Sequence, residues 1–234
     1  MSGTPWDYIA KLVCIGDSGC GKSSLTIRLC EGRFSPHHDV TIGVEFGSRI
    51  IPTPPRWPPR TPRDASSVPQ KHMKLSLWDT AGQETYKSVT RSYFRGASGA
   101  LLVFDLSRKQ TFQHVTDWLN DLRQIAEPDI VVILVGNKAD LTQQNDNKRE
   151  VTREEAEEWA SRNGVMEYVE TSAKSGENVE KAFMRVAERI YQNIQAGKYD
   201  LNDRRSGVKG PAAGGNRQVR LAGDSSKSSA GGCC

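Results

Sequence analysis

Residues Gly16–Ser23 read Gly-Asp-Ser-Gly-Cys-Gly-Lys-Ser and fit the pattern G-x-x-x-x-G-K-[ST]. An apolar, strand-like run from Tyr8 to Ile15 precedes them, and an amphipathic, helix-like run from Ser24 to Cys30 follows. Strand, glycine-rich loop and helix in this order form a unit whose backbone N–H groups cradle the phosphates of a nucleotide. The alternative is a plain glycine-rich turn. The pattern therefore predicts an α/β domain with a phosphate-binding loop.

Two side chains of this loop have predicted chemical roles. Lys22 would reach the β- and γ-phosphates, and the Ser23 hydroxyl would ligate Mg²⁺. The remaining residues would contact the phosphates and the nearby nucleotide atoms, mainly through their backbone. This predicted set is Gly16, Asp17, Ser18, Gly19, Cys20, Gly21 and Ser24.

The apolar patterns downstream predict a sheet with helices on both faces. Gly99–Leu106 and Ile130–Gly136 are continuous apolar runs, typical of parallel strands that are covered on both faces. Val44–Ile51 and Lys74–Trp78 predict a hairpin that supplies one antiparallel edge strand. With Tyr8–Ile15 and Met166–Glu170 we expect a six-stranded, mostly parallel α/β sheet.

Helix signals alternate with these strands. Apolar residues recur at helical spacing from Phe112 to Ile125 and from Val179 to Tyr191. Thr152 and Glu155 form a capping box that opens a further helix, which we expect to end near residues 163–164.

Composition limits the class of protein. The 234 residues suffice for one sizeable domain with a tail, or for two small domains, and no apolar run approaches the length of a membrane span. Neither a signal peptide nor an N-myristoylation site is expected. The net charge of +4 lies in residues 197–234, where seven basic and three acidic side chains occur. The neutral remainder argues against broad nucleic-acid binding, and the dispersed cysteines indicate a reducing, cytosolic compartment.

Residues 197–234 show no apolar periodicity and are rich in glycine, serine and charged residues. We expect residues 1–196 to form the folded domain and residues 197–234 to form a disordered tether. The flexible-linker rule gives this tether a root-mean-square reach of roughly 31–37 Å.

A second constellation follows the predicted strand Lys74–Trp78 directly. Asp79, at the strand end, is placed to hold Mg²⁺, and the Gly82 N–H could meet a γ-phosphate. Gln83 is placed to orient an attacking water molecule. A solvated loop glutamine would be the alternative for Gln83 outside this context.

Asn137-Lys138-Ala139-Asp140 follows another apolar strand. The Asp140 carboxylate can accept two hydrogen bonds, which suits the N1–H and exocyclic amino group of guanine. Ser172-Ala173-Lys174, after the last predicted strand, would complete the base pocket through the Ala173 N–H.

Together these motifs resemble the Ras-like small GTPases and, within them, the Rab family of membrane-traffic regulators. The resemblance covers roughly Ile9–Ile194 and the last two residues. The Rab-specific segments are Ile42–Phe46, Lys74–Trp78, Arg91–Gly96, Leu101–Asp105 and the closing Gly-Gly-Cys-Cys. The segment from His38 to Ser48 is most similar to the Rab subgroup of early-endosome recycling and early secretory traffic.

The resemblance implies further roles. Phe34 would flank the guanine, and Thr41 would bind Mg²⁺ and the γ-phosphate in the GTP state only. Lys22, Thr41 and Gln83 would form the catalytic set. The loops around Thr41 and Gln83 would be the two switches that GTP hydrolysis releases. Phe46, Trp78 and Tyr93 match the aromatic triad read by effectors, although packing beneath the switches is compatible with that role.

It also implies partners and a membrane anchor. Cys233 and Cys234 lack the C-a-a-X form, which excludes the ordinary single-prenyl route. The resemblance implies two geranylgeranyl groups instead, added by the Rab-specific transferase with its escort protein. A GDP dissociation inhibitor would extract the lipidated chain, while an exchange factor, a GTPase-activating protein and vesicle effectors would act on the switches. We expect a monomer on the cytoplasmic face of early or recycling endosomes, or of Golgi and endoplasmic reticulum, with a cytosolic pool.

The chain departs from the Rab pattern in two places. Glu84-Thr85-Tyr86 stands where Glu-Arg-Phe is usual, which affects partner choice at that switch. Pro52–Gln70 holds seven of the eleven prolines and replaces a short hairpin turn. This insert is a solvated loop, a translated intron, or a polyproline ligand centred on Arg56–Pro62. The hairpin would hold it more than about 20 Å from the nucleotide.

The predicted reaction converts GTP and water to GDP and phosphate, slowly unless an activating protein supplies an arginine. Two other classes compete with this interpretation. A P-loop kinase or ATPase would have no use for Asn137–Asp140 and would let ATP compete with GDP. A nucleotide-locked binding scaffold would show no activator-stimulated turnover.

Overall fold

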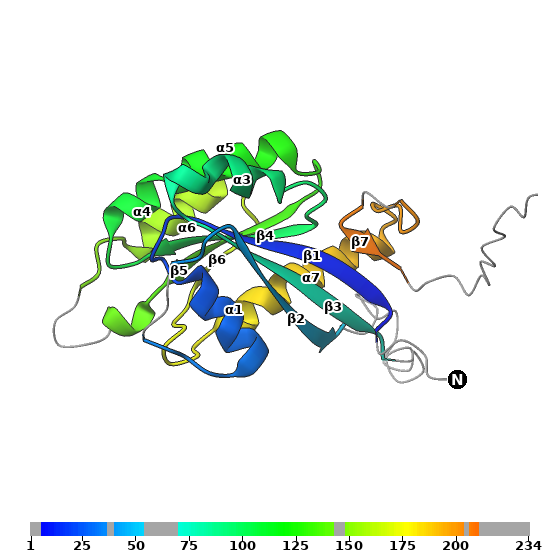
Figure 1. Cartoon of the computed structure of the whole chain (residues 1–234), viewed down its shortest axis with the longest axis horizontal. Helices are drawn as coiled ribbons and strands as arrows, with labels where there is room; N and C mark the ends of the chain where they lie inside the picture. Colours follow the sequence, from blue (N-terminus) through cyan, green and yellow to red (C-terminus); the bar gives the residue numbers. More distant parts are fainter. Residues whose placement is uncertain (1–5, 37–39, 54–69, 143–147, 204–205, 211–234) are drawn as a thin grey trace, which may run out of the picture.

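The computed structural model of this chain describes residues 6–36, 40–53, 70–142, 148–203 and 206–210 (Figure 1). The described residues contain one seven-stranded sheet, and six of its strands follow one another in the order β2-β3-β1-β4-β5-β6. Their bounds are β1 (Tyr8–Ile15), β2 (Val44–Pro52), β3 (His72–Thr80), β4 (Gly99–Asp105), β5 (Val131–Asn137) and β6 (Tyr168–Glu170). Every pair along this path is parallel except β2–β3, which is antiparallel and lies at the edge, so the predicted fold class is confirmed.

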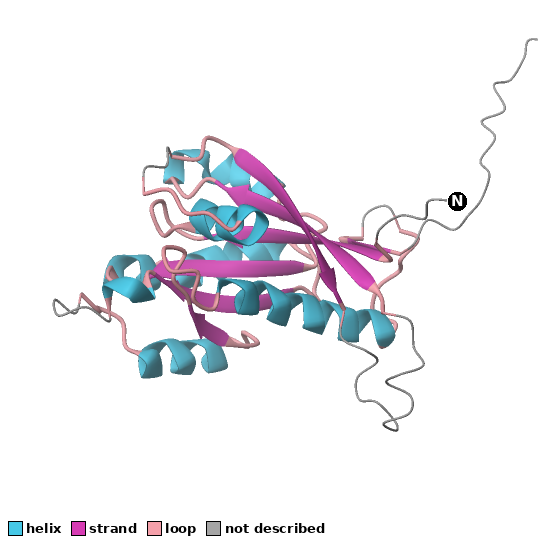
Figure 2. Cartoon of the chain, turned by 90° about the horizontal axis from the view of Figure 1, so that it is seen from below, coloured by secondary structure: helices cyan, strands magenta, loops and turns pink. Residues whose placement is uncertain are grey.

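Helices cover both faces of the sheet (Figures 1 and 2). One face carries α1 (Lys22–Glu31) and α7 (Val179–Gln195), and the other carries α3 (Lys87–Ser92), α4 (Lys109–Gln113), α5 (Val115–Ile125) and α6 (Arg153–Arg162). Side chains of β1 alternate between the two hydrophobic cores, with Leu12 and Cys14 facing α7 and Val13 and Ile15 facing α5. This period of two is what a strand covered on both faces requires.

The predicted capping box opens α6. The Thr152 Oγ1 accepts a hydrogen bond from the Glu155 N–H at 3.2 Å, and the Thr152 N–H donates to the Glu155 carboxylate at 3.0 Å. The helix ends at Arg162, with Asn163 as its C-terminal cap, as expected. In the described part of the chain, no helix is both long enough and apolar enough to span a bilayer.

The β2–β3 hairpin is longer than the sequence predicts. Its register runs from the pair Val44–Thr80 to the pair Pro52–His72, and the Thr53 N–H donates to the Lys71 carbonyl at 2.8 Å. Nine residues per strand put the far end of the hairpin roughly 27 Å from its switch end at about 3.4 Å per residue. Most of the predicted proline-rich insert, residues 54–69, lies outside the described residues.

The chain stays ordered beyond Gly197, where we expected a disordered tether to begin. Residues 198–203 and 206–210 are described, and β7 (Val208–Lys209) pairs antiparallel with Ile9 and Ala10 of β1. The β4 strand begins opposite Leu12, which leaves the edge of β1 at Ile9–Ala10 open to β7. The folded part of the chain therefore continues past residue 197, at least as far as Gly210.

The close packing of β7 explains why it holds this position. Val208 is fully buried in the core that faces α7. A Cβ at Gly207 would lie 1.9 Å from the Gly96 carbonyl oxygen, so only glycine allows the backbone to approach so closely. A two-residue strand carries no detectable periodicity, so its pairing could not be foreseen from the pattern.

Candidate nucleotide-binding site

A cavity of about 490 Å³ opens at the carboxyl ends of the parallel strands, where ligands bind on sheets of this kind. Most of the residues predicted to contact a nucleotide line it. These are Ser18, Gly19, Gly21, Lys22, Ser23, Ser24, Phe34, Thr41, Gly82, Asn137, Lys138, Asp140, Ala173 and Lys174. The fold thus brings together motifs that are separated by more than 100 residues in the sequence.

Six other predicted residues do not line the cavity, namely Gly16, Asp17, Cys20, Asp79, Gln83 and Ser172. Conversely, four lining residues were not predicted, namely Ser35, Pro36, Val40 and Leu141. Each of these four lies next to a predicted residue or one further along the chain. Extending each motif by one or two residues would have found them.

The phosphate loop wraps around a buried lysine. The Lys22 Nζ donates to the carbonyl oxygens of Gly16 at 2.8 Å and Asp17 at 2.9 Å, and the residue is 5% exposed. The helix α1 begins at Lys22, so its first N–H groups lack partners within the helix and its positive dipole end faces the cavity. A buried ammonium group at a helix N-terminus is suited to bind the phosphates of a nucleotide.

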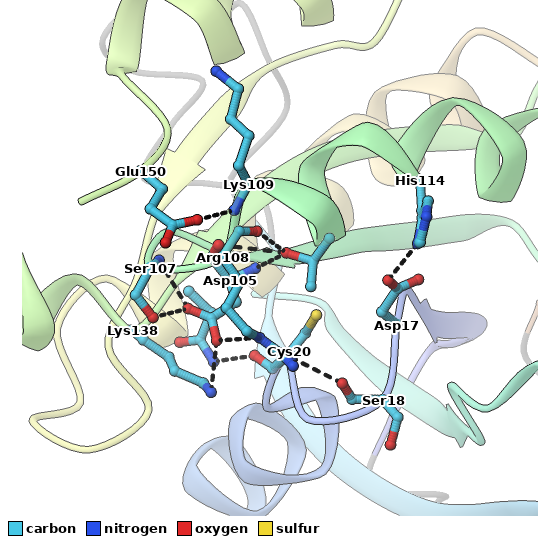
Figure 3. A network of polar contacts seen from close by, with 12 residues as sticks. Asp17, Ser18, Cys20, Asp105, Ser107, Arg108, Lys109, His114, Lys138 and Glu150 are labelled. Atoms are coloured by element: carbon cyan, nitrogen blue, oxygen red, sulfur yellow. Dashed lines mark hydrogen bonds and ion pairs between the residues drawn. The ribbon is translucent and has the colours of Figure 1, made fainter. Parts of the chain in front are cut away.

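The Asp17 side chain points away from the cavity. Its carboxylate lies 2.7 Å from the His114 Nδ1, as Figure 3 shows, and accepts a hydrogen bond from the Trp118 Nε1 at 2.8 Å. These contacts tie the loop to the start of α5. Asp17 therefore offers a ligand only its backbone, and its side chain anchors the loop.

The three predicted metal ligands converge. The Ser23 hydroxyl donates to the Asp79 carboxylate and lies 2.9 Å from the Thr41 hydroxyl, which is 3.5 Å from the same Asp79 oxygen. Among the described residues, no group of three or more His, Cys, Asp and Glu side chains could hold a metal. Two hydroxyls and a carboxylate form a hard oxygen set, which suits Mg²⁺. Asp79 is fully buried and Thr41 is 8% exposed, so the set is preorganised.

Gly82 packs directly on the phosphate loop. Its carbonyl accepts a hydrogen bond from the Ser18 N–H at 3.0 Å. A Cβ at Gly82 would lie 2.4 Å from the Ser18 nitrogen and 2.5 Å from the Lys22 Nζ, so a side chain would not fit here. Gln83 follows immediately and its carbonyl accepts from the Tyr86 N–H, but its side chain does not line the cavity.

Asn137 joins the phosphate loop to the predicted base loops. Its Nδ2 donates to the Cys20 carbonyl at 2.8 Å, and its Oδ1 accepts from the Thr171 hydroxyl and from the Ala173 N–H, both at 3.2 Å. Asn137 is 1% exposed, and hydrogen bonds of this kind are strong when they are buried. One side chain therefore sets the spacing between the phosphate and base ends of the cavity.

Asp140 is positioned by a hydroxyl group from the loop that follows β6. One of its carboxylate oxygens accepts a hydrogen bond from the Ser172 hydroxyl at 2.7 Å. Ser172 is fully buried and does not line the cavity, so its hydroxyl orients the Asp140 carboxylate and does not contact a ligand itself. Lys138 adopts the left-handed conformation (φ 69°), which is uncommon for a residue other than glycine and often occurs at functional sites.

Arg28 supports the site although no sequence motif marks it. On α1, the Arg28 Nε donates to the Ala173 carbonyl at 2.9 Å and another guanidinium nitrogen donates to the Lys174 carbonyl at 2.5 Å. Arg28 thereby holds the loop whose Ala173 N–H donates to Asn137. These contacts join residues more than 140 positions apart, and no local pattern marks them.

The predicted aromatic triad forms one cluster on the outer face of β2 and β3. The Phe46 and Trp78 ring centroids are 4.6 Å apart, and those of Trp78 and Tyr93 are 5.6 Å apart. Phe46 is 65% exposed, so most of this large apolar ring faces solvent. The Lys11 Nζ lies 3.9 Å from the Trp78 ring centroid, and burial lowers the pKa of Lys11 to about 8.

Comparison with known families agrees with this geometry. The sequence model of the Ras family matches residues 11–192, which is well over half of the chain. The matched region contains the phosphate loop, the oxygen cluster and both base loops. Ras-type proteins bind GTP and GDP with Mg²⁺ and hydrolyse GTP, and the residues that line the cavity fit these ligands. The chain therefore belongs to the Ras family of small GTPases.

Proposed function

We propose that this Ras-family protein is a Rab-type switch that recruits effectors in its GTP state and regulates vesicle-mediated transport. One observation supports the binding of a guanine nucleotide. A single cavity is lined by the buried Lys22, by the hydroxyl pair of Ser23 and Thr41, and by Asp140, which we propose to bind guanine. ATP offers no N1–H and amino pair to Asp140, which argues against a P-loop kinase or ATPase.

The proposed reaction is the hydrolysis of GTP to GDP and phosphate. Lys22 and the first N–H groups of α1 would stabilise charge on the phosphates, and Mg²⁺, when bound at Ser23, Thr41 and Asp79, would neutralise more of it. Gln83 would orient the attacking water molecule. No arginine is among the described residues that line the cavity, so we infer slow hydrolysis that an activating protein accelerates by supplying one.

The Rab-specific part of the proposal is supported by the aromatic cluster, in which Phe46 is exposed and Trp78 and Tyr93 are partly buried. Phe46, Trp78 and Tyr93 lie on and beside the hairpin that connects the two switch loops. An exposed aromatic surface that is continuous with both switches would let an effector sense whether GTP is bound. Two further large apolar side chains are exposed near the switches: Ile42, next to Thr41, at 77% and Val89, on α3, at 45%.

The proposed membrane anchor rests on the sequence, because Cys233 and Cys234 lie outside the described residues. Two geranylgeranyl groups at these cysteines would give stable anchoring, whereas one lipid chain gives marginal binding. We infer that the escort protein, the transferase and the GDP dissociation inhibitor act on this end. We also propose the cytoplasmic face of endosomes, or of Golgi and endoplasmic reticulum, as the site of action.

The proposed activity is tested by nucleotide competition and by single-turnover hydrolysis. We expect GDP, but not ADP, to displace a fluorescent GDP analogue, and hydrolysis of bound GTP to be slow. We expect Gln83→Leu to retain nucleotide affinity and to lose nearly all hydrolysis, with or without a GTPase-activating protein. Unchanged turnover in Gln83→Leu would refute the role of Gln83, and displacement by ADP would refute guanine selection.

The anchor is tested separately. Mass spectrometry of the protein from cells should find lipid on both terminal cysteines, and imaging should place an amino-terminally tagged chain on endomembranes. The matched control is the double variant Cys233→Ser/Cys234→Ser, which should be diffuse. Diffuse signal from both chains would contradict the proposed membrane anchor and leave the proposed binding and hydrolysis of GTP unaffected.

A further inference from the structure

A buried carboxylate outside the cavity connects the phosphate loop with the Asn137–Asp140 motif. Asp105, the last residue of β4, is 1% exposed. One of its oxygens accepts hydrogen bonds from the Ser107 N–H at 2.9 Å and the Ser107 hydroxyl at 2.7 Å. The other lies 2.7 Å from the Lys138 Nζ and 3.2 Å from the Arg108 Nε (Figure 3).

The environment of Asp105 keeps it ionised. Burial raises its pKa, but the hydrogen bonds from Lys138 and Ser107 outweigh burial, and the net effect lowers the pKa below its ordinary value. The negative charge at neutral pH then holds two cations from different parts of the chain, because Lys138 belongs to the base motif and Arg108 follows β4.

Arg108 extends from this carboxylate to the outer side of the phosphate loop (Figure 3). A terminal guanidinium nitrogen donates to the Ser18 carbonyl at 3.0 Å. The same nitrogen would lie 3.2 Å from a Cβ at Gly19, so the guanidinium packs on the loop itself. Arg108 does not line the cavity, whereas Ser18 and Gly19 do.

The planarity of the peptide group gives this contact a consequence inside the cavity. In a trans peptide the carbonyl of one residue and the N–H of the next point in opposite directions. Holding the Ser18 carbonyl outward therefore turns the Gly19 N–H the other way. Asn137 holds the Cys20 carbonyl in the same manner at 2.8 Å, which turns the Gly21 N–H.

We propose that Arg108, anchored by Asp105, is a positioning residue that presents the Gly19 N–H to the phosphates and thereby slows the release of bound nucleotide. The inference rests on the proposed nucleotide binding and adds a residue outside the recognised motifs. Arg108 acts through the Ser18 carbonyl and fixes the orientation of the peptide group between Ser18 and Gly19. A loop without this contact would have to order that peptide group when the nucleotide binds.

The test measures the dissociation rate of a ribose-labelled fluorescent GDP (mant-GDP) from the full chain. Arg108→Ala should release it about tenfold faster, since it loses a charge-assisted hydrogen bond at a half-exposed site. Arg108→Lys keeps the charge but cannot reach both the Asp105 carboxylate and the Ser18 carbonyl. Its dissociation rate should therefore lie between those of the unmodified protein and Arg108→Ala. The matched control is Arg123→Ala, which removes a guanidinium bond to the Asn163 carbonyl at the far end of α5.

Two further readouts separate positioning from a general loss of structure. The affinity for mant-GMP, which lacks the β-phosphate, should fall less in Arg108→Ala than the affinity for mant-GDP. Asp105→Asn should speed release more than Arg108→Ala because it also frees Lys138. In the double variant the two effects should be less than additive, because both act through the same contact.

The outcomes are distinguishable. If the unmodified protein binds mant-GDP but Arg108→Ala releases it at the control rate, the inference is overturned and the proposed function stands. Equal losses for mant-GDP and mant-GMP would also overturn it, since they indicate general destabilisation. If the unmodified protein binds no guanine nucleotide, the proposed function fails and the inference fails with it. Arg108 is half exposed, so its variants remain informative even if Asp105→Asn does not fold.

Discussion

The short strand β7 can be tested by shortening one side chain. Val208 is fully buried against β1 and the α7 face of the core. Val208→Ala removes two buried carbon atoms, and each buried methylene group contributes about 0.8 kcal/mol. We therefore expect a loss of about 1.5 kcal/mol, which corresponds to roughly a tenfold change in an equilibrium constant.

The loss should appear as local opening rather than as global unfolding. The β7 strand has only two residues and pairs with the edge of β1, so it can detach while the rest of the sheet stays folded. The reporter is the Lys11 amide, whose N–H donates to the Gly207 carbonyl at 2.8 Å. Hydrogen exchange at this amide should be about tenfold faster in Val208→Ala, because the loss of about 1.5 kcal/mol raises the equilibrium constant for local opening by that factor.

Val165→Ala is the control for global stability. Val165 is 7% exposed in the core between the sheet and α6, away from β7. This variant should lower the melting temperature and leave the local exchange of Lys11 unchanged. If the Lys11 amide exchanges equally fast in the unmodified protein and in Val208→Ala, the proposed pairing of β7 with β1 in solution is refuted.

Two other predictions concern the aromatic cluster and the base pocket. Because burial lowers the pKa of Lys11 to about 8 while the unfolded chain keeps the ordinary value of 10.5, the free energy of unfolding should rise as pH rises from 8 towards 10.5. Trp78 fluorescence should titrate over the lower part of this range, and Lys11→Met should abolish the titration; an identical titration in that variant would contradict the assignment. Asp140→Ala should weaken GDP binding at least about 100-fold while weakening IDP, which lacks the exocyclic amino group, by less. Equal losses for GDP and IDP in a competition assay would exclude Asp140 as the reader of that group.

Much of the fold follows from patterns that span fewer than about twenty residues. The phosphate loop, the capping box of Thr152 and Glu155, and the alternation of Lys74–Trp78 each describe a backbone geometry that local residues stabilise by themselves. The order of strands and helices then leaves few topologies, because parallel strands need right-handed crossovers. This is why the six predicted strands, and the meeting of the motifs at one sheet edge, agree with the structure.

The direction of individual side chains was harder to foresee. Asp17 lies within the phosphate motif, yet its carboxylate contacts His114 and Trp118 rather than the cavity. Arg28 and Arg108 lie in segments without a recognisable motif, yet each holds a loop of the site through backbone carbonyls. A carbonyl acceptor leaves no mark in the sequence, since every residue has one.

The sequence by itself determined the motifs of this Ras-family protein: the phosphate loop, the Asn137–Asp140 motif and the residues Ser23, Thr41 and Asp79 proposed for Mg²⁺, each marked by residue type and position in the sequence. Only the tertiary structure decided which residues hold the loops of the site through backbone contacts, and that Val208 and Lys209 join the sheet. The open edge of β1 exists because β4 starts late, and Val208 fills it because burial and strand pairing together outweigh the entropy of ordering a few residues. Such contacts depend on distances between segments far apart in the chain, and a local pattern contains no information about those distances.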